Sequence, residues 1–226
     1  PSVVAALITC WLTFLLARDL FDRRVAWLAV VVLATCGRFW WQARTVQIDM
    51  VLTACLTAAL YLFWRWHNDR RMGWLVGFYV CLALAVYAKG PPGVVFPLLL
   101  IFAFYWKQRE PRRKTHWAIG VASVALAIAA WLVPARMSIA DAASPEVQSA
   151  IGGSLFRQTI GRFILGVNHA EMPWYYLENL PVDWLPWTIF APFAVLYAWR
   201  HRGDGPAMRL LLCWTVPAFV FFSISV

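Results

Sequence analysis

The chain has 226 residues, of which 62% are hydrophobic and only 14% are charged. A soluble globular domain is closer to ~45–50% apolar and ~25% charged, so this composition excludes an ordinary soluble domain and indicates a membrane protein. The formal net charge of +9 is typical of nucleic-acid-binding proteins, but the positions of the charges along the chain exclude a nucleic-acid partner.

Apolar segments long enough to cross a bilayer recur along the whole chain. A membrane-spanning helix needs roughly 20 apolar residues, within a range of about 17–25. The sequence therefore predicts an all-α polytopic membrane protein with about eight transmembrane helices and no soluble domain. The predicted spans are residues 1–17, 25–41, 46–64, 74–88, 91–106, 117–134, 184–199 and 208–226.

Both ends of the chain fall inside apolar segments, PSVVAALITCWL at the start and TVPAFVFFSISV at the end. We therefore expect residues 1–226 to be part of one larger transmembrane domain, with a helix and a loop before it and further chain after it. The first segment has neither a basic start nor a small-residue cleavage site, so a signal peptide is not predicted.

Basic residues are concentrated in alternate connections between the predicted spans. Fourteen of the 20 Lys and Arg residues lie in the connections after the first, third, fifth and seventh spans, and the other connections hold six. The positive-inside rule places the first set in the cytoplasm. The six other basic residues then lie on the outer face, where they have no orienting role.

One outer connection is long, spanning residues 135–183. Ser144 and Pro145 have the features of a helix start, and apolar residues recur on one face over residues 147–164. This pattern predicts an amphipathic helix that lies on the outer membrane surface. Aromatic residues that favour the membrane interface follow it.

Charged residues at the predicted outer ends of two spans are the first candidates for a functional site. Asp49 lies about one turn inside the third span, where an ionisable side chain costs from about 2.5 kcal/mol upward. It could stabilise the helix N-terminus, pair with Arg44 or belong to a polar site at the outer surface. The sequence leaves these three interpretations open.

Lys89 stands in YAKGPPG, where one predicted helix ends and the next begins. Gly90 permits close backbone approach, and Pro91 and Pro92 suit the first turn of a helix. Helix N-termini bind anions and a neighbouring lysine strengthens such a site, so we predict that Lys89 binds a phosphate. The alternative is a lysine that reaches to the membrane surface from a helix end.

Three further candidates lie in the long outer connection. Arg157 and Arg162 fall on the predicted surface helix, where they could bind a substrate phosphate or the anionic head groups of membrane lipids. His169 follows in GVNHAEMPWYY and is either a substrate-binding or a solvated side chain. The five cysteines lie singly in apolar segments, and no metal-ligand cluster or nucleotide-binding motif is found, so we expect no metal and no cofactor.

Four stretches, in order, resemble the lipid-linked glycosyltransferases of the GT-C fold. They are ARTVQIDMVLTACLTAALYLFW, YAKGPPGVVFPLLL, GRFILGVNHAEMPWYYLENLPVDWLPW and WTVPAFVFFSIS. They cover nearly the whole chain. The group that they resemble most is that of the protein O-mannosyltransferases and lipid A aminoarabinose transferases.

The resemblance implies an enzyme that moves a sugar from a polyprenyl-phosphate donor to a lipid, protein or glycan acceptor. It also implies a site on the outer, periplasmic face of the bacterial inner membrane. In the family an acidic residue of the first external loop is the general base, and that loop would precede Pro1, so the chain alone is expected to be inactive. Asp49 would position the acceptor or support a cation, and Lys89, with Arg44 or Arg162, would stabilise the leaving phosphate.

Two other functions are compatible with a polytopic chain of this kind. A transporter or flippase of lipid-linked sugars would carry charges deep in its spans and a repeated half, whereas these spans are nearly free of charge. A non-catalytic membrane subunit with the GT-C fold would lack the acidic residue of the first loop.

Overall fold

The computed structural model describes residues 1–90, 92–105 and 175–224, together with six single positions between 120 and 137. These ranges contain helices and connecting turns and no β-strand, as the all-α prediction requires. The elements are α1 (Ser2–Leu20), α2 (Arg23–Thr35), α3 (Gly37–Arg44), α4 (Ile48–Asp69), α5 (Met72–Lys89), α6 (Pro92–Tyr105), α10 (Tyr175–Asp183), the 3-10 helix η3 (Trp187–Phe190), α11 (Ala191–Arg200) and α12 (Pro206–Ile224).

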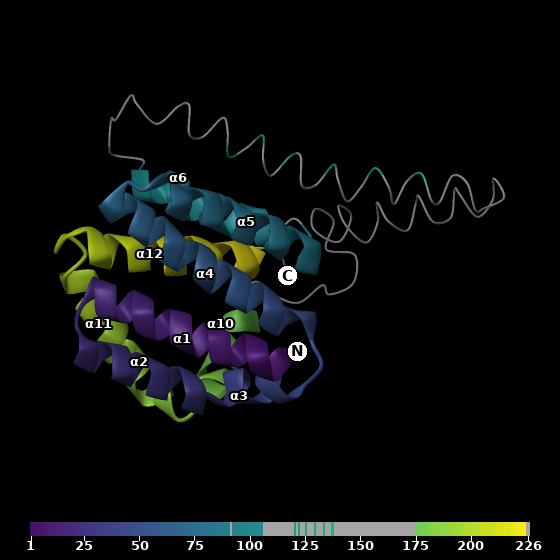
Figure 1. The fold of residues 1–226 in the computed structure, drawn as a ribbon. Helices are drawn as coiled ribbons and strands as arrows, with labels where there is room; N and C mark the ends of the chain where they lie inside the picture. The colour runs from purple at the N-terminus through teal and green to yellow at the C-terminus, as the bar shows by residue number, and fades with distance from the viewer. Residues whose placement is uncertain are drawn as a thin grey trace.

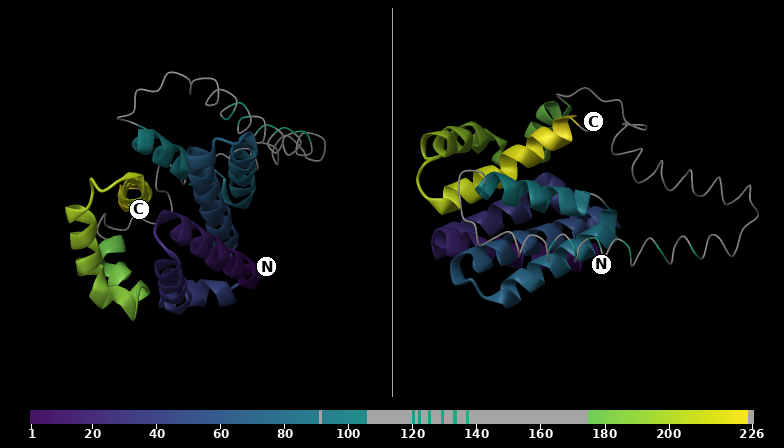
Figure 2. Two further views of the ribbon diagram at one scale, coloured as in Figure 1. Left: turned by 60° about the vertical axis from the view of Figure 1, so that its left-hand side comes forward. Right: turned by 90° about the horizontal axis from the view of Figure 1, so that it is seen from above.

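The long helices run side by side: α1–α2, α4–α5 and α5–α6 are antiparallel pairs, whereas α1 runs in the same direction as its neighbour α4. From one edge to the other, α2 packs on α1, α1 on α4, α4 on α5 and α5 on α6 (Figure 1). The helices α10, α11 and α12 form a layer along one side of α1–α6, with α12 against α6 (Figure 2). The connections α1–α2, α4–α5 and α11–α12 share one end of the bundle, and α3–α4 and α5–α6 share the other.

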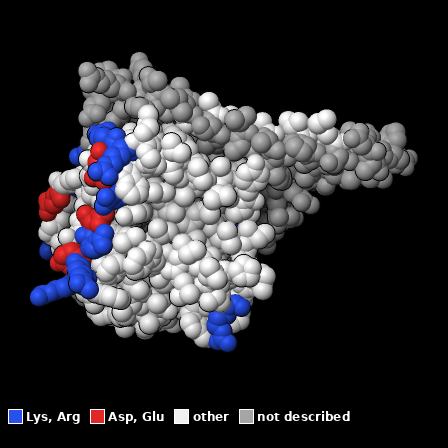
Figure 3. All heavy atoms as spheres, in the orientation of Figure 1, with Lys and Arg blue, Asp and Glu red and all other residues white. Residues whose placement is uncertain are grey.

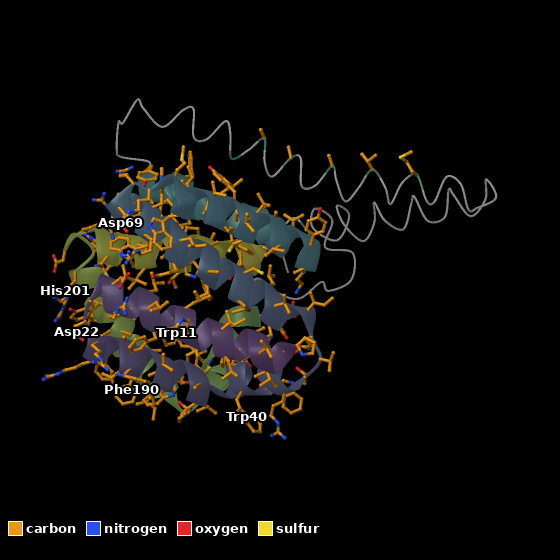
Figure 4. All side chains as sticks on the ribbon, in the orientation of Figure 1. Trp11, Asp22, Trp40, Asp69, Phe190 and His201 are labelled. Carbon is orange, nitrogen blue, oxygen red and sulfur yellow. The ribbon has the colours of Figure 1, made fainter. Side chains whose placement is uncertain are left out.

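Charged side chains follow this two-ended arrangement. Figure 3 shows most of them gathered at the end that holds the α4–α5 connection, with a small basic patch near the opposite end and an almost uncharged surface between them on the face in view. Asp69, at the end of α4, and Trp40, in α3, mark the two opposite ends in Figure 4. The segregation agrees with the alternation of basic residues that the sequence shows.

The core lies where α4, α5 and α6 meet. Phe63, Phe78 and Phe104 are almost completely buried there, and the ring of Phe63 lies 6.1 Å from that of Phe78 and 5.6 Å from that of Phe104. Helices in a bilayer gain little from burying apolar surface against one another, because lipid tails are equally apolar. Close van der Waals packing of this kind therefore fixes how α4 and α5 lie together.

An ionic cluster joins α1 and α4 at the highly charged end. Arg65 donates to Asp19 at 3.1 Å and to Asp69 at 2.9 Å, and its guanidinium lies 5.1 Å from the ring centroid of Trp74. The Asp19 side chain is only 15% exposed. A carboxylate this buried needs a cationic partner, and Arg65 supplies one.

Several predicted spans are confirmed as long apolar helices. Within the described ranges, three helices are long and apolar enough to cross a membrane: Ser2–Leu20, Ile48–Asp69 and Met72–Lys89. Two shorter apolar helices, Gly93–Tyr105 and Pro206–Val220, fall where spans were predicted. The predicted span 117–134 and the surface helix predicted from Ser144 lie outside the continuously described ranges.

The predicted span over residues 25–41 is apolar enough to cross a membrane, but it is bent and not one straight helix. The chain forms two helices there, α2 and α3, with a bend of 64° between them. Cys36 between them has extended backbone angles, φ −67° and ψ 125°. At about 1.5 Å per residue, the 13 residues of α2 reach only about 20 Å, less than the ~30 Å of a bilayer core.

Contacts from far along the chain stabilise this break, and we call residues 35–38 the elbow. The Gly37 N–H donates to the Leu185 carbonyl at 3.0 Å, and the Cys36 thiol donates to the Asp183 carbonyl at 3.2 Å. The Trp187 indole Nε1–H donates to the Thr35 hydroxyl at 2.8 Å. Polar groups freed by the break thus find partners in the segment between α10 and η3.

The prediction of one continuous helix over residues 184–199 is wrong. The chain turns after α10, forms η3 and only then begins α11, whose ten residues reach about 15 Å. Pro186 has no N–H with which to continue a helix, and the Trp187 N–H instead closes a turn onto the Trp184 carbonyl at 2.8 Å. The last residues of the predicted connection 135–183 are helical, as α10.

The elbow contact can be tested through Trp187. Trp187→Phe keeps most of the ring and removes the donor to Thr35, so the free energy of unfolding should fall by about 0.5–1.5 kcal/mol. Thermal unfolding in detergent of the wild type, Trp187→Phe, Thr35→Val and the double variant would measure the coupling. Strictly additive losses would show that the two side chains do not interact.

Candidate functional site

Asp49 stands in the first turn of α4, at the end of the bundle opposite the ionic cluster. The neighbouring Met50 is completely buried with Ala5 and Ala6 of α1 and against Phe39 of α3. This packing fixes the first turn of α4 against two other helices. The Asp49 carboxylate, 37% exposed, remains at the surface.

Lys89 stands in the last turn of α5, and Gly90 ends the helix. Gly90 has φ 75° and ψ −141°, a conformation open essentially only to glycine, and its N–H donates to the Val86 carbonyl at 2.7 Å. The turn that follows is closed by the Gly93 N–H, which donates to the Gly90 carbonyl at 3.0 Å.

The structure brings these two predicted site residues together. The Lys89 ammonium donates to the Asp49 carboxylate, so the end of α5 is joined to the start of α4 by an ion pair. The sequence left open a pair of Asp49 with Arg44, but the ion pair that the structure describes for Asp49 is with Lys89. Each charge also stands at the helix end whose dipole favours it.

The N-terminus of α6 has fewer backbone N–H groups for binding an anion than the sequence suggested. Pro91 and Pro92 have no N–H, and the Gly93 N–H is already bonded to Gly90. Few backbone donors are therefore left at this helix N-terminus. The Lys89 side chain can donate three hydrogen bonds, and the structure describes one of them, to Asp49.

Arg44 takes a different place from the one expected. It lies at the end of α3, and its guanidinium is 4.5 Å from the ring centroid of Trp40, an exposed side chain on the same helix. Arg38, also on α3, is 3.9 Å from Asp183. Stacking of this kind suits an arginine at a membrane interface.

The other candidates, Arg157, Arg162 and His169, lie outside the described residues. In the ranges that the structure describes, no group of three or more His, Cys, Asp or Glu side chains is placed to hold a metal ion. A small apolar cavity between α4, α5 and α6 is lined by Phe63, Phe78 and Tyr105 among others. It has no charged lining residue and lies toward the far end of the bundle from Asp49, so we take the ion pair and not this cavity as the candidate site.

Two features of the site region were missed by sequence reasoning. The elbow contacts join residues about 150 positions apart, and no local signal in the sequence marks such a pairing. The close approach of Gly93 to α5, where an added Cβ would lie 2.5 Å from the Ala85 carbonyl carbon, was missed as well, although a second glycine directly after KGPP is a signal of such an approach.

The first part of the chain matches a family described as dolichyl-phosphate-mannose-protein mannosyltransferase, over residues 1–133. The chain is 28% identical to the undecaprenyl phosphate-alpha-4-amino-4-deoxy-L-arabinose arabinosyl transferase of Erwinia tasmaniensis and 26% identical to that of Pseudomonas aeruginosa. Each alignment covers 99% of this chain and 40% of the relative, so the chain spans about two-fifths of the length of these relatives.

Solved structures share the fold. The crystal structure of ArnT from Cupriavidus metallidurans bound to undecaprenyl phosphate has a TM-score of 0.79 with this chain at 21% identity. The same protein in the apo state has a TM-score of 0.73 at 20% identity. Both cover 99% of this chain and 40% of the solved chain, which identifies the fold as that of part of a polytopic membrane protein.

The exposure of the ion pair predicts that it contributes little to stability. Ion pairs in contact with solvent are worth about 0–1 kcal/mol, so Asp49→Asn and Lys89→Met should each lower the free energy of unfolding by less than about 1 kcal/mol. Leu82→Ala, at a completely buried position of α5, should cost about 2–5 kcal/mol and serves as the reference. Thermal unfolding in detergent measures all three. Losses at Asp49 or Lys89 as large as that of Leu82→Ala would make the pair a structural element.

Proposed function

Because the chain belongs to the dolichyl-phosphate-mannose-protein mannosyltransferase family, we propose that it is part of a membrane enzyme that transfers a sugar from a polyprenyl-phosphate donor. The family that the sequence motifs indicated is the one that the match over residues 1–133 identifies. The observation that carries the proposal is the Asp49–Lys89 pair. Two opposite charges stand on neighbouring apolar helices, at one end of the bundle, and stay accessible to a ligand.

The donor is proposed from chemistry and from relatives. A lysine at the end of an apolar helix can hold a phosphate at the membrane surface while the attached prenyl chain stays in the lipid. The names of the relatives specify an undecaprenyl-phosphate-linked aminoarabinose, and ArnT was crystallised with undecaprenyl phosphate. Both facts support a polyprenyl-phosphate sugar as the donor here and leave the sugar open.

We place the reaction on the outer face of the bacterial inner membrane. Fourteen of the 20 basic residues fall in the connections that the positive-inside rule assigns to the cytoplasm. The α4–α5 connection belongs to that set, and Asp49 and Lys89 stand at the other ends of the same two helices. This arrangement supports a site that faces the periplasm.

The proposed reaction is a displacement at the anomeric carbon of the donor sugar. An acceptor oxygen or nitrogen forms the new bond, the bond from the anomeric carbon to the phosphate oxygen breaks, and polyprenyl phosphate leaves with the electron pair. Lys89 donates hydrogen bonds to the phosphate as its negative charge develops. Asp49 directs the ammonium through their ion pair, and its carboxylate can accept a hydrogen bond from the acceptor group.

The proton of the acceptor passes to a general base, which we propose lies in a loop before Pro1. The acceptor itself, a lipid, protein or glycan, is left open. Arg157, Arg162 and His169 are proposed to bind substrate from the long outer connection. Arg44, stacked on Trp40, is proposed to bind the phosphate of the donor or of a neighbouring lipid.

The experiment uses the full-length protein in proteoliposomes with a polyprenyl-phosphate sugar donor. Lys89→Ala should lower the transfer rate by at least about 100-fold, because one preorganised donor to a developing negative charge is worth about 10²–10³. Lys107→Ala, on the side assigned to the cytoplasm, is the matched control and should keep the wild-type rate. Asp49→Asn should also abolish transfer while the protein accumulates normally.

Release of polyprenyl phosphate from the donor is the product to measure, since a transporter moves the donor without cleaving it. Equal rates in Lys89→Ala and Lys107→Ala would remove Lys89 from the site. Movement of intact donor across the bilayer, without release of polyprenyl phosphate, would replace the transferase by a flippase.

A further inference from the structure

Gly93, in the first turn of α6, packs directly on the backbone of α5. A Cβ atom at this position would lie 2.5 Å from the carbonyl carbon of Ala85, 2.6 Å from its oxygen and 2.8 Å from the Val86 nitrogen. Non-bonded carbon atoms are most stable about 3.5–4.0 Å apart. Because the atoms in contact belong to the backbone, no rotation of a side chain can make room.

The contact falls on the turn that carries Lys89. Ala85 and Val86 precede Lys89 by four and three residues, so they form the last turn of α5 with it. Ala85 is completely buried, and the Val86 carbonyl accepts the N–H of Gly90. The last turn of α5 is thus held by the Gly90 hydrogen bond at its end and by Gly93 on its side.

The two glycines near the start of α5 make no such close contact with backbone atoms. Gly73, at the start of α5, has no atom within 4 Å of a Cβ, and Gly77 would meet only the side chain of Leu62, at 3.3 Å. Alanine is a better helix former than glycine by about 1 kcal/mol. A harmful effect of Gly93→Ala would therefore come from the contact with α5 and not from the propensity of α6.

We propose that Gly93 is a positioning residue for Lys89. The missing side chain lets the first turn of α6 lie against the last turn of α5, and this contact sets where the Lys89 ammonium stands relative to Asp49 and to a phosphate. The part of this proposal that concerns a bound phosphate rests on the proposed function. The part that concerns the Asp49–Lys89 geometry stands on the structure alone.

The geometry is tested without any assay of activity. Lysines of the full-length protein are methylated with ¹³C, which keeps their charge, and the Lys89 signal is assigned with Lys89→Arg. In the wild type and in Gly73→Ala, Asp49→Asn should shift the Lys89 signal, because the ion pair is lost. In Gly93→Ala the signal should already be shifted, and Asp49→Asn should change it little.

Transfer kinetics give the second measurement. Gly93→Ala should lower kcat/KM for the donor about tenfold or more, while Gly73→Ala keeps the wild-type value. In a Lys89→Met background, Gly93→Ala should have almost no further effect, because its effect runs through Lys89. Equal losses in both backgrounds would make Gly93 a general packing residue and overturn the proposal.

The Lys89 signal and the transfer kinetics together distinguish the positioning role of Gly93 from the role of Lys89 in substrate binding. An unchanged Lys89 signal in Gly93→Ala overturns the positioning role, whatever Lys89→Ala does to transfer. A shifted signal with an unchanged transfer rate supports the positioning and counts against Lys89 as a substrate-binding residue. A Gly93→Ala protein that fails to accumulate would assign the contact to folding and overturn the positioning role.

Discussion

The ion pair between Asp49 and Lys89 depends on how tightly α4 and α5 pack over their whole length. The two charges stand at the same end because the helices are antiparallel and are joined by a short turn, in which Arg70 is left-handed with φ 56°. Phe63 and Phe78 lock the pair of helices near that turn, and Met50 locks the start of α4 on α1. Apolar packing thus sets the geometry of a polar site that itself adds little stability.

The need to pair polar backbone groups is a second constraint on this fold. Within a bilayer, N–H and C=O groups need partners inside the protein, because neither water nor lipid tails supply them. The break between α2 and α3 meets this requirement by taking partners from the segment after α10. This irregular segment is therefore built from two distant parts of the chain, and each part supplies hydrogen-bond partners for the other.

Local patterns predicted much of the fold and the centre of the site. The long helices α1, α4 and α5 follow from uninterrupted apolar runs, and Asp49 and Lys89 stood out because charges are rare in such runs. The break at Cys36 could not be predicted, because VVLATCGRFWW has no proline and its partners lie near residue 185. The sequence left open a pair of Arg44 with Asp49, whereas in the structure Arg44 stacks on the nearby aromatic ring of Trp40.

The elbow also implies an order of events during biosynthesis. Its partners, Asp183, Leu185 and Trp187, leave the ribosome about 150 residues after Thr35, when α4, α5 and α6 have already been made. Until then the groups at Thr35, Cys36 and Gly37 lack these partners. The contacts of the elbow therefore form only after most of the chain has been synthesised, so this end of the bundle is completed late.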